Sequence, residues 1–219
     1  MSRVSNPSFL QGYWPLSSAY EVGGEVQDIS GHNRHGIPTA LTYEDGPVNG
    51  KSIADFNGSS SFVRIPHDEG LALNGSATVS FWMNKKNASL LRFIIFKGTS
   101  NDSTMKFEYR INTTPGLREL ASTINGQYKD SLSEAFLDSH LFLSVVFDAD
   151  NANFSDNSIY QSNKGLIGNV ASNSDIYIGR QRLDAFGNYF EGNVYNVRVY
   201  DCALTQNEIK EIYNLERKR

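Results

Sequence analysis

The sequence predicts an all-β fold of two stacked antiparallel sheets, with a short helix near the C-terminal end. Short segments in which apolar and polar residues alternate recur along the 219 residues, and this period of two is typical of half-buried strands. Asn-Gly pairs, which favour tight turns, separate many of these segments. No strands alternate with long helical patterns, so a parallel α/β sheet is excluded.

Individual strands follow from the same alternation. Residues 77–83 alternate Val79, Phe81 and Met83 with Thr78, Ser80 and Trp82, which predicts a half-buried strand. Residues 52–56 and 61–65 flank the Asn57-Gly58 pair and predict a hairpin. The apolar run at 90–98 predicts a central strand. Further strands are expected at 13–16, 106–112, 120–124, 141–148, 158–161, 175–180 and 193–200.

Residues 205–216 are the one segment with helical spacing. Thr205 is suited to the N-cap and Glu208 follows three residues later, which completes a capping box. The residues expected on the apolar side of this helix are Leu204, Ile209, Ile212 and Leu215.

The chain is expected to form one domain over residues 1–219, with 1–10 as an N-terminal extension and 205–219 as a terminal helix and basic tail. The polar segment 148–158 is interpreted as an exposed loop. A domain boundary there would leave a C-terminal piece too small to bury a core.

Composition narrows the partners and the compartment. The net charge is -4 and the basic residues are scattered, so no nucleic-acid partner is expected. No apolar stretch is long enough for a membrane span, and the given chain shows no signal peptide. The single cysteine, Cys202, excludes an internal disulfide and is expected to be a buried small hydrophobe. We expect an extracellular or virion-surface location.

Two motifs at the ends of the chain carry a family resemblance. The first is YWPLSSAYEVGGEVQDISGHNRHG at 13–36, and the second is IYIGRQRLDAFGNYFEGNVYNVRVYDCALTQNEIKEIY at 176–213. The chain resembles the concanavalin A-like lectin/glucanase group, specifically the laminin-G-like jelly-roll domains, over nearly its whole length. The resemblance implies a two-sheet jelly-roll sandwich. It implies function only by class, because these sandwiches carry unrelated binding surfaces.

The turn at Asp28 is the candidate metal site. The segment DISGHNRHG offers carboxylate, hydroxyl, amide and carbonyl oxygens, which calcium prefers. In similar domains the matching segment helps to bind a structural calcium, completed by an acidic pair that is Tyr195 and Asn196 here. We expect one structural calcium held by Asp28, by carbonyls near Gly31 and Asn33, and by Asn196. In the alternative, Asp28 caps its own turn by accepting backbone hydrogen bonds.

No catalytic constellation is found in the sequence. The Glu-x-Asp-x-x-Glu strand of laminarinase-type relatives and the Gly-x-Ser-x-Gly elbow are both missing. A short match at Arg118, Glu119 and Leu120 to a lyase strand lacks its partner strands. His32 and His35 lack further zinc ligands. A non-catalytic binding module is therefore expected.

Two loops carry the candidate ligand-binding residues. Tyr128 lies in one, and Arg182, Asp184 and Tyr189 lie in the other. An aromatic ring can stack on a sugar while charged groups bind its hydroxyls. We expect recognition of a glycan or cell-surface polysaccharide, or adhesion. The alternatives are a structural or receptor-binding virion component, with virion proteins or further copies of the chain (a homo-oligomer) as partners, and a polysaccharide lyase or hydrolase.

Overall fold

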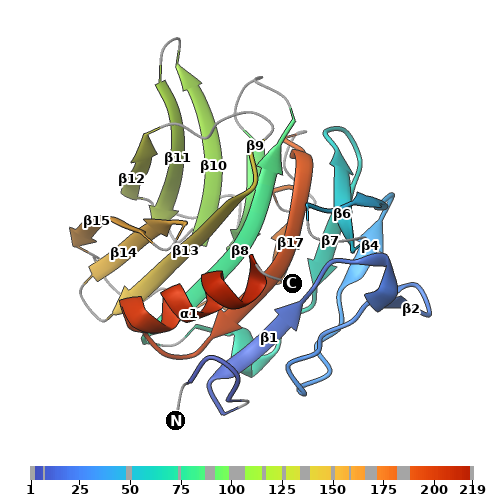
Figure 1. Ribbon diagram of the computed structural model, residues 1–219, viewed down its shortest axis with the longest axis horizontal. Helices are drawn as coiled ribbons and strands as arrows, with labels where there is room; N and C mark the ends of the chain where they lie inside the picture. Colours follow the sequence, from blue (N-terminus) through green and yellow to red (C-terminus); the bar gives the residue numbers. More distant parts are fainter. Residues whose placement is uncertain are drawn as a thin grey trace.

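Two large antiparallel sheets stack face to face in a computed structural model of the protein (Figure 1). The arrangement confirms the predicted jelly-roll sandwich with a short C-terminal helix. The structure describes residues 3–6, 8–47, 51–73, 75–86, 92–98, 107–114, 117–124, 127–133, 139–148, 151–157, 159–165, 172–181 and 188–217.

The larger sheet, called sheet A, has eight strands among the described residues. The N-terminal strand β1 pairs with the long strand β17 near the C-terminus, with Tyr13 opposite Arg198. This pairing brings the two ends of the chain together in one sheet. The strands in spatial order are β15 (Ile159–Gly165), β14 (Asn151–Asp156), β13 (Leu141–Asp148), β8 (Ala77–Lys85), β17 (Glu191–Tyr200), β6 (Ser52–Asn57) and β5 (Thr42–Asp45), with β1 (Leu10–Trp14) beside β17.

The second sheet, sheet C, has seven strands in the described part of the chain, and the apolar run predicted as a central strand forms its middle strand, β9. Short elements join the sheets: the pair β2 (Glu21–Val22) and β3 (Glu25–Val26), and the 3-10 turns η1 (Ser18–Tyr20) and η2 (Glu69–Leu71). The strands of sheet C in spatial order are β12 (Gln127–Ser133), β11 (Leu117–Ile124), β10 (Phe107–Thr114), β9 (Arg92–Lys97), β16 (Ile176–Ile178), β7 (Phe62–Ile65) and β4 (Ile37–Thr39).

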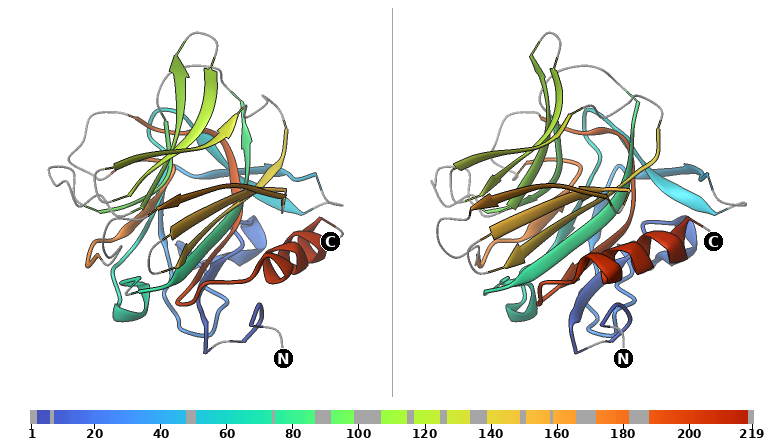
Figure 2. Two further views of the ribbon diagram at one scale, coloured as in Figure 1. Left: turned by 90° about the vertical axis from the view of Figure 1, so that its left-hand side faces the viewer. Right: turned by 60° about the vertical axis from the view of Figure 1, so that its left-hand side comes forward.

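Strand β8 is buried on both of its faces, whereas the sequence predicted a half-buried strand. One face packs between the sheets through Val79, Phe81 and Met83. The helix α1 (Gln206–Glu216) lies across β13, β8 and β17 and covers much of the other face, called here the outer face of sheet A (Figures 1 and 2). The prediction was wrong because periodicity within a strand does not show what a distant helix covers.

The helix begins as the sequence predicts. The Thr205 hydroxyl accepts the backbone N–H of Glu208, and the Glu208 carboxylate accepts the backbone N–H of Thr205, which forms the capping box. Ile209 and Ile212 are buried against sheet A, but Leu215 is 44% exposed, contrary to prediction. No helix in the described residues has the length and apolar character needed to cross a membrane.

Two local predictions were wrong. Residues 52–65 do not form a hairpin, because β6 pairs within sheet A and β7 within sheet C. The Asn57 side chain accepts backbone N–H groups from Ser59 and Ser60 and carries the chain from one sheet to the other. The segment predicted as an exposed loop at 148–158 contains β14, whose Ala152 and Phe154 are buried.

A bulge in β17 decides which side chains face α1. Tyr195 lies opposite Trp82 and Arg198 lies opposite Ser80, so β17 has two residues between these pairs where β8 has one, and β17 thus carries one extra residue. Asn196 in the bulge has a φ of 52°. The irregularity places both Tyr195 and Arg198 on the outer face. Arg198 forms a buried ion pair with Glu216 at the end of α1.

Placing a charge under α1 should destabilise the whole domain. Ile209 is 2% exposed, so Ile209→Asp should lower the free energy of unfolding by about 3 kcal/mol through an unpaired buried carboxylate. Chemical denaturation measures this loss. Lys210→Ala, on the exposed side of the same turn, is the control and should leave stability nearly unchanged. Equal stability of Ile209→Asp and wild type would show that the helix is peripheral.

Acid should weaken the link between the N-terminus and α1. Hydrogen bonds from the Arg3 guanidinium, at 2.8 and 2.5 Å, lower the pKa of Glu208 from 4.5 to about 2. The unfolded chain therefore binds the proton more readily, and this stability is lost as pH falls from about 4.5 to about 2. Thermal melts should show a shallower acid loss in Glu208→Gln and in Arg3→Ala. Parallel acid profiles in all three proteins would contradict the assignment.

A polar cluster on the outer face of sheet A as the candidate functional site

A row of polar side chains crosses three neighbouring strands of sheet A and continues at the residue directly before a fourth strand, β13. Asp55 of β6 pairs with Asn193 of β17, and Asn193 pairs with Asn84 of β8. His140 directly precedes Leu141, the partner of Met83, and is therefore in line with Asn84. Residues directly opposite in an antiparallel sheet point to the same side. The four side chains thus share the outer face.

Hydrogen bonds join this row to two further charged residues. The Asn193 amide donates to Glu44 at 2.9 Å. The Lys86 ammonium donates to Glu44 at 2.6 Å and to Asp55 at 2.8 Å. Asn84 donates to the Asn193 side-chain oxygen at 3.4 Å. We call this group the polar cluster: Glu44, Asp55, Asn84, Lys86, His140 and Asn193.

Burial divides the polar cluster into a floor and a rim. Asn193 is fully buried and Asn84 is 7% exposed, so the two amides form the floor. The side chains of Glu44, Asp55 and Lys86 are 40%, 28% and 32% exposed and form the rim. Among the residues that the structure describes, the Asn84 side-chain oxygen has no hydrogen-bond partner. A buried acceptor without a donor is costly in a folded protein.

The charges of the polar cluster are largely fixed at neutral pH. The hydrogen bond from Lys86 holds the pKa of Glu44 below its usual value. Burial lowers the pKa of His140, so the imidazole stays neutral at pH 7. Two carboxylates and one ammonium therefore leave a small negative charge on the rim.

The backbone next to the polar cluster requires a glycine. Gly192 lies in β17 with a φ of 140°, and a Cβ atom there would clash with the Asn84 carbonyl oxygen. The missing side chain lets β17 approach β8 closely. This close approach sets Asn193 beside Asn84.

An aromatic row borders the polar cluster on the side of α1. Trp82 lies in β8 between Tyr195 and Phe142, and its ring stacks on Tyr195 with centroids 5.9 Å apart. Tyr213 of α1 stacks on Trp82 at 5.6 Å. The Tyr195 hydroxyl lies 3.2 Å from Nδ1 of His140. Because Trp82 is only 7% exposed, the polar cluster is more open to solvent than the Trp82 ring beside it.

The predicted calcium ligands meet at a turn whose carboxylate is already in use. Asp28 is 5% exposed and accepts hydrogen bonds from the backbone N–H groups of Tyr13, Ser30 and Arg34 and from the Ser30 hydroxyl, all within 3.0 Å. The Asn196 side chain accepts a hydrogen bond from the Tyr13 hydroxyl at 3.3 Å, and the Tyr13 backbone N–H in turn donates to Asp28.

These oxygen atoms do not fit calcium in the observed geometry, because both oxygens of Asp28 already accept hydrogen bonds and the described part of the chain holds no group of three or more His, Cys, Asp or Glu side chains that could bind a metal ion. Gly31 and Asn33, with φ of 100° and 59°, shape the turn. The arrangement is the alternative in which Asp28 caps its own turn. Calcium at this loop stays a prediction.

The predicted glycan-contact residues lie on the opposite sheet or outside the described part. The Tyr128 side chain, Arg182 and Asp184 are outside the described residues. Tyr189 is half-buried and bridges to Phe93 of sheet C. Arg180 donates to its hydroxyl at 2.9 Å and lies 4.8 Å above its ring. Tyr189 thus belongs to a small cluster of packed aromatic residues on sheet C: Phe62, Phe93, Phe96 and Tyr177.

The sequence and the fold together place the chain in a family. The chain belongs to the concanavalin A-like lectin/glucanases superfamily, whose family model matches residues 57–210. No curated protein matches the chain.

Several solved structures share the fold at low identity. Domain 4 of AbnA, an extracellular GH43 arabinanase from Geobacillus stearothermophilus in complex with arabinotriose, is 17% identical with a TM-score of 0.72, covering 93% of this chain and 98% of that domain. The binding domain of Paraclostridial Mosquitocidal Protein 1 is 13% identical with a TM-score of 0.73, and the match covers 95% of this chain and 52% of that chain. The binding domain of botulinum neurotoxin DC, in complex with rat synaptotagmin II, is 13% identical with a TM-score of 0.70, and the match again covers 95% of this chain and 52% of that chain. The chain thus spans about half of these two toxin domains.

Removing the Asp28 carboxylate should cost stability whether or not calcium is present. Asp28→Ala leaves three backbone donors without their acceptor, and we expect a loss of about 3 kcal/mol. Thermal melts in chelator and in millimolar calcium measure it, with Glu25→Ala, an exposed neighbouring carboxylate, as the control. If calcium stabilises the wild type, by roughly 3 kcal/mol at a hundredfold excess over its Kd, and Asp28→Ala abolishes the effect, the loop holds the metal.

Proposed function

We propose that this protein is a non-catalytic glycan-binding module whose ligand sits on the polar cluster. The observation that carries the proposal is the buried Asn84–Asn193 floor beneath a charged rim, with the Asn84 oxygen lacking a donor among the described residues. A sugar hydroxyl, or a water molecule bound to the sugar, can donate a hydrogen bond to the Asn84 oxygen once a rim side chain changes its conformation. Sites built from a few convergent polar groups give ligands their orientation and specificity.

The family supports a carbohydrate ligand as the first choice. The arabinanase domain that resembles this chain over nearly its full length was solved with arabinotriose. Identity of 17% carries the fold alone, so the ligand is argued from the polar cluster. An extracellular or virion-surface location is part of the proposal, because glycan surfaces are found there.

The charges of the rim support binding rather than hydrolysis. A general acid for glycoside cleavage needs a carboxyl group whose pKa is raised. Here Lys86 binds both Glu44 and Asp55 and holds the pKa of Glu44 below its usual value. Both carboxylates are therefore suited to accepting hydrogen bonds from hydroxyl groups.

A glycan array with a multivalent display of the domain tests the proposal. Glu44→Gln should weaken binding about tenfold, because a hydrogen bond to a charged acceptor is lost. Tyr189→Ala on sheet C tests the loop site predicted from the sequence and should leave binding intact. Tyr20→Ala, an exposed tyrosine, is the control for loss of an aromatic ring.

Two outcomes would change the assignment. Loss of binding in Tyr189→Ala together with full binding in Glu44→Gln would move the site to the loops on sheet C. If the wild-type display binds no glycan in a broad panel, glycan recognition is wrong. Because a toxin domain of similar fold was solved with a protein receptor, a receptor-binding component of a virion or other assembly would then take its place.

A further inference from the structure

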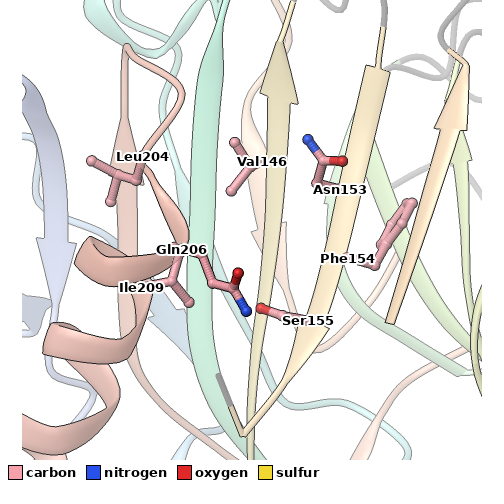
Figure 3. Close-up of a pocket in the computed structure, with 7 residues that line it drawn as sticks. All are labelled: Val146, Asn153, Phe154, Ser155, Leu204, Gln206 and Ile209. Carbon is pink, nitrogen blue, oxygen red and sulfur yellow. The ribbon is translucent and has the colours of Figure 1, made fainter. Parts of the chain in front are cut away.

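A pocket lies on the outer face of sheet A, between the first turn of α1 and the strands β13 and β14 (Figure 3). Its volume is about 190 Å³. Val146 lies opposite Thr78 in β8, six residues from Asn84. At about 3.4 Å per residue, the pocket lies roughly 20 Å from the polar cluster, beyond the aromatic row. The two sites are therefore separate.

The pocket has one apolar wall and one polar wall. Val146, Leu204 and Ile209 supply the apolar wall and are all buried. Asn153, Ser155 and Gln206 supply the polar wall. Figure 3 shows the Gln206 amide and the Ser155 hydroxyl turned toward one another across the opening, with Asn153 further along β14.

The serine in the polar wall belongs to a pair of hydroxyl groups. The Ser155 and Ser144 oxygens lie 2.5 Å apart and both residues are buried. Each hydroxyl carries one hydrogen, and only one of the two hydrogens lies between the oxygens. When Ser144 donates, Ser155 keeps its hydrogen for a molecule in the pocket. Ser155 and the Gln206 amide can thus both donate to a ligand and accept from it.

We propose that this pocket is a second ligand site, which takes one neutral sugar ring. The choice of a sugar rests on the proposed function, whereas the neutral charge and the size of the ligand are argued from the residues that line the pocket and from its volume. A sugar ring has an apolar C–H face and an edge of hydroxyl groups, which match the two walls. No lining residue is charged, so an anion or a cation would lose its hydration without a counter-charge. The volume is below that of pockets for drug-sized ligands, roughly 300 Å³ and above, which limits the site to one ring.

Nuclear magnetic resonance of the full chain tests the site with glucose, galactose and arabinose as neutral probes and glucuronate as the anionic one. We expect at least one neutral sugar to shift the amide signals of Asn153 and Gln206 saturably, with a millimolar Kd typical of a ligand of about a dozen atoms. Glucuronate should bind at least about tenfold more weakly.

Matched variants locate the binding. Gln206 and Asn207 are both exposed on the first turn of α1, and Gln206 alone lines the pocket. Gln206→Ala should weaken sugar binding about fivefold, and Asn207→Ala should not change it. Thermal melts check that both variants stay folded. Glu44→Gln should retain binding in the pocket even where it loses binding to the glycan array, so the two proposals can fail separately.

Three results would overturn the second site. One is the absence of any shift at the pocket with all three neutral sugars at about 100 mM, well above a millimolar Kd. Another is equal binding of glucuronate, which contradicts a site for neutral ligands. The third is saturable binding that Gln206→Ala leaves unchanged.

Discussion

The ion pair between Arg198 of β17 and Glu216 of α1 fixes the outer face of sheet A. The Glu216 carboxylate also accepts the Trp82 indole N–H at 2.6 Å, and the Arg198 guanidinium lies 3.8 Å above the Tyr13 ring. Removing one partner of a buried pair leaves an uncompensated charge, at a cost of about 3–5 kcal/mol. One contact thus ties together β1, β8, β17 and the helix, including both ends of the chain.

This anchor also decides which parts of the sheet a ligand can reach. With α1 held on Trp82, the aromatic row becomes a second small core, and Tyr213 closes it from solvent. The polar cluster lies beyond the covered rings and stays open at its rim. The pocket lies beside Gln206, at the N-terminal end of α1. Both proposed sites therefore lie on parts of the outer face of sheet A that the helix leaves uncovered.

Local patterns predicted most elements of the fold, because their information lies within a few residues. The capping box of Thr205 and Glu208 and the strand β13 were predicted at their observed positions. The turn at Asn57 was recognised, but an Asn-Gly pair does not reveal which sheet the next strand joins. The strand β14 was missed because Asn and Asp, which disfavour strands, surround its buried Ala152 and Phe154.

The candidate site was harder to predict because its residues are brought together only by the register of the paired strands. Asp28 and Tyr189 were predicted as site residues, since polar and aromatic residues in loops resemble binding sites. The polar cluster instead joins residues from four strands, and no single strand shows a motif. Asn84 is the one local signal, a buried amide that follows the apolar run of β8. Asn84 becomes part of a site because Gly192 lets Asn193 lie beside it. The β17 bulge in turn places Arg198 on the side of α1. A one-residue slip of β17 would move Asn193 to the opposite face, so the pairing of strands, rather than any motif, creates the site.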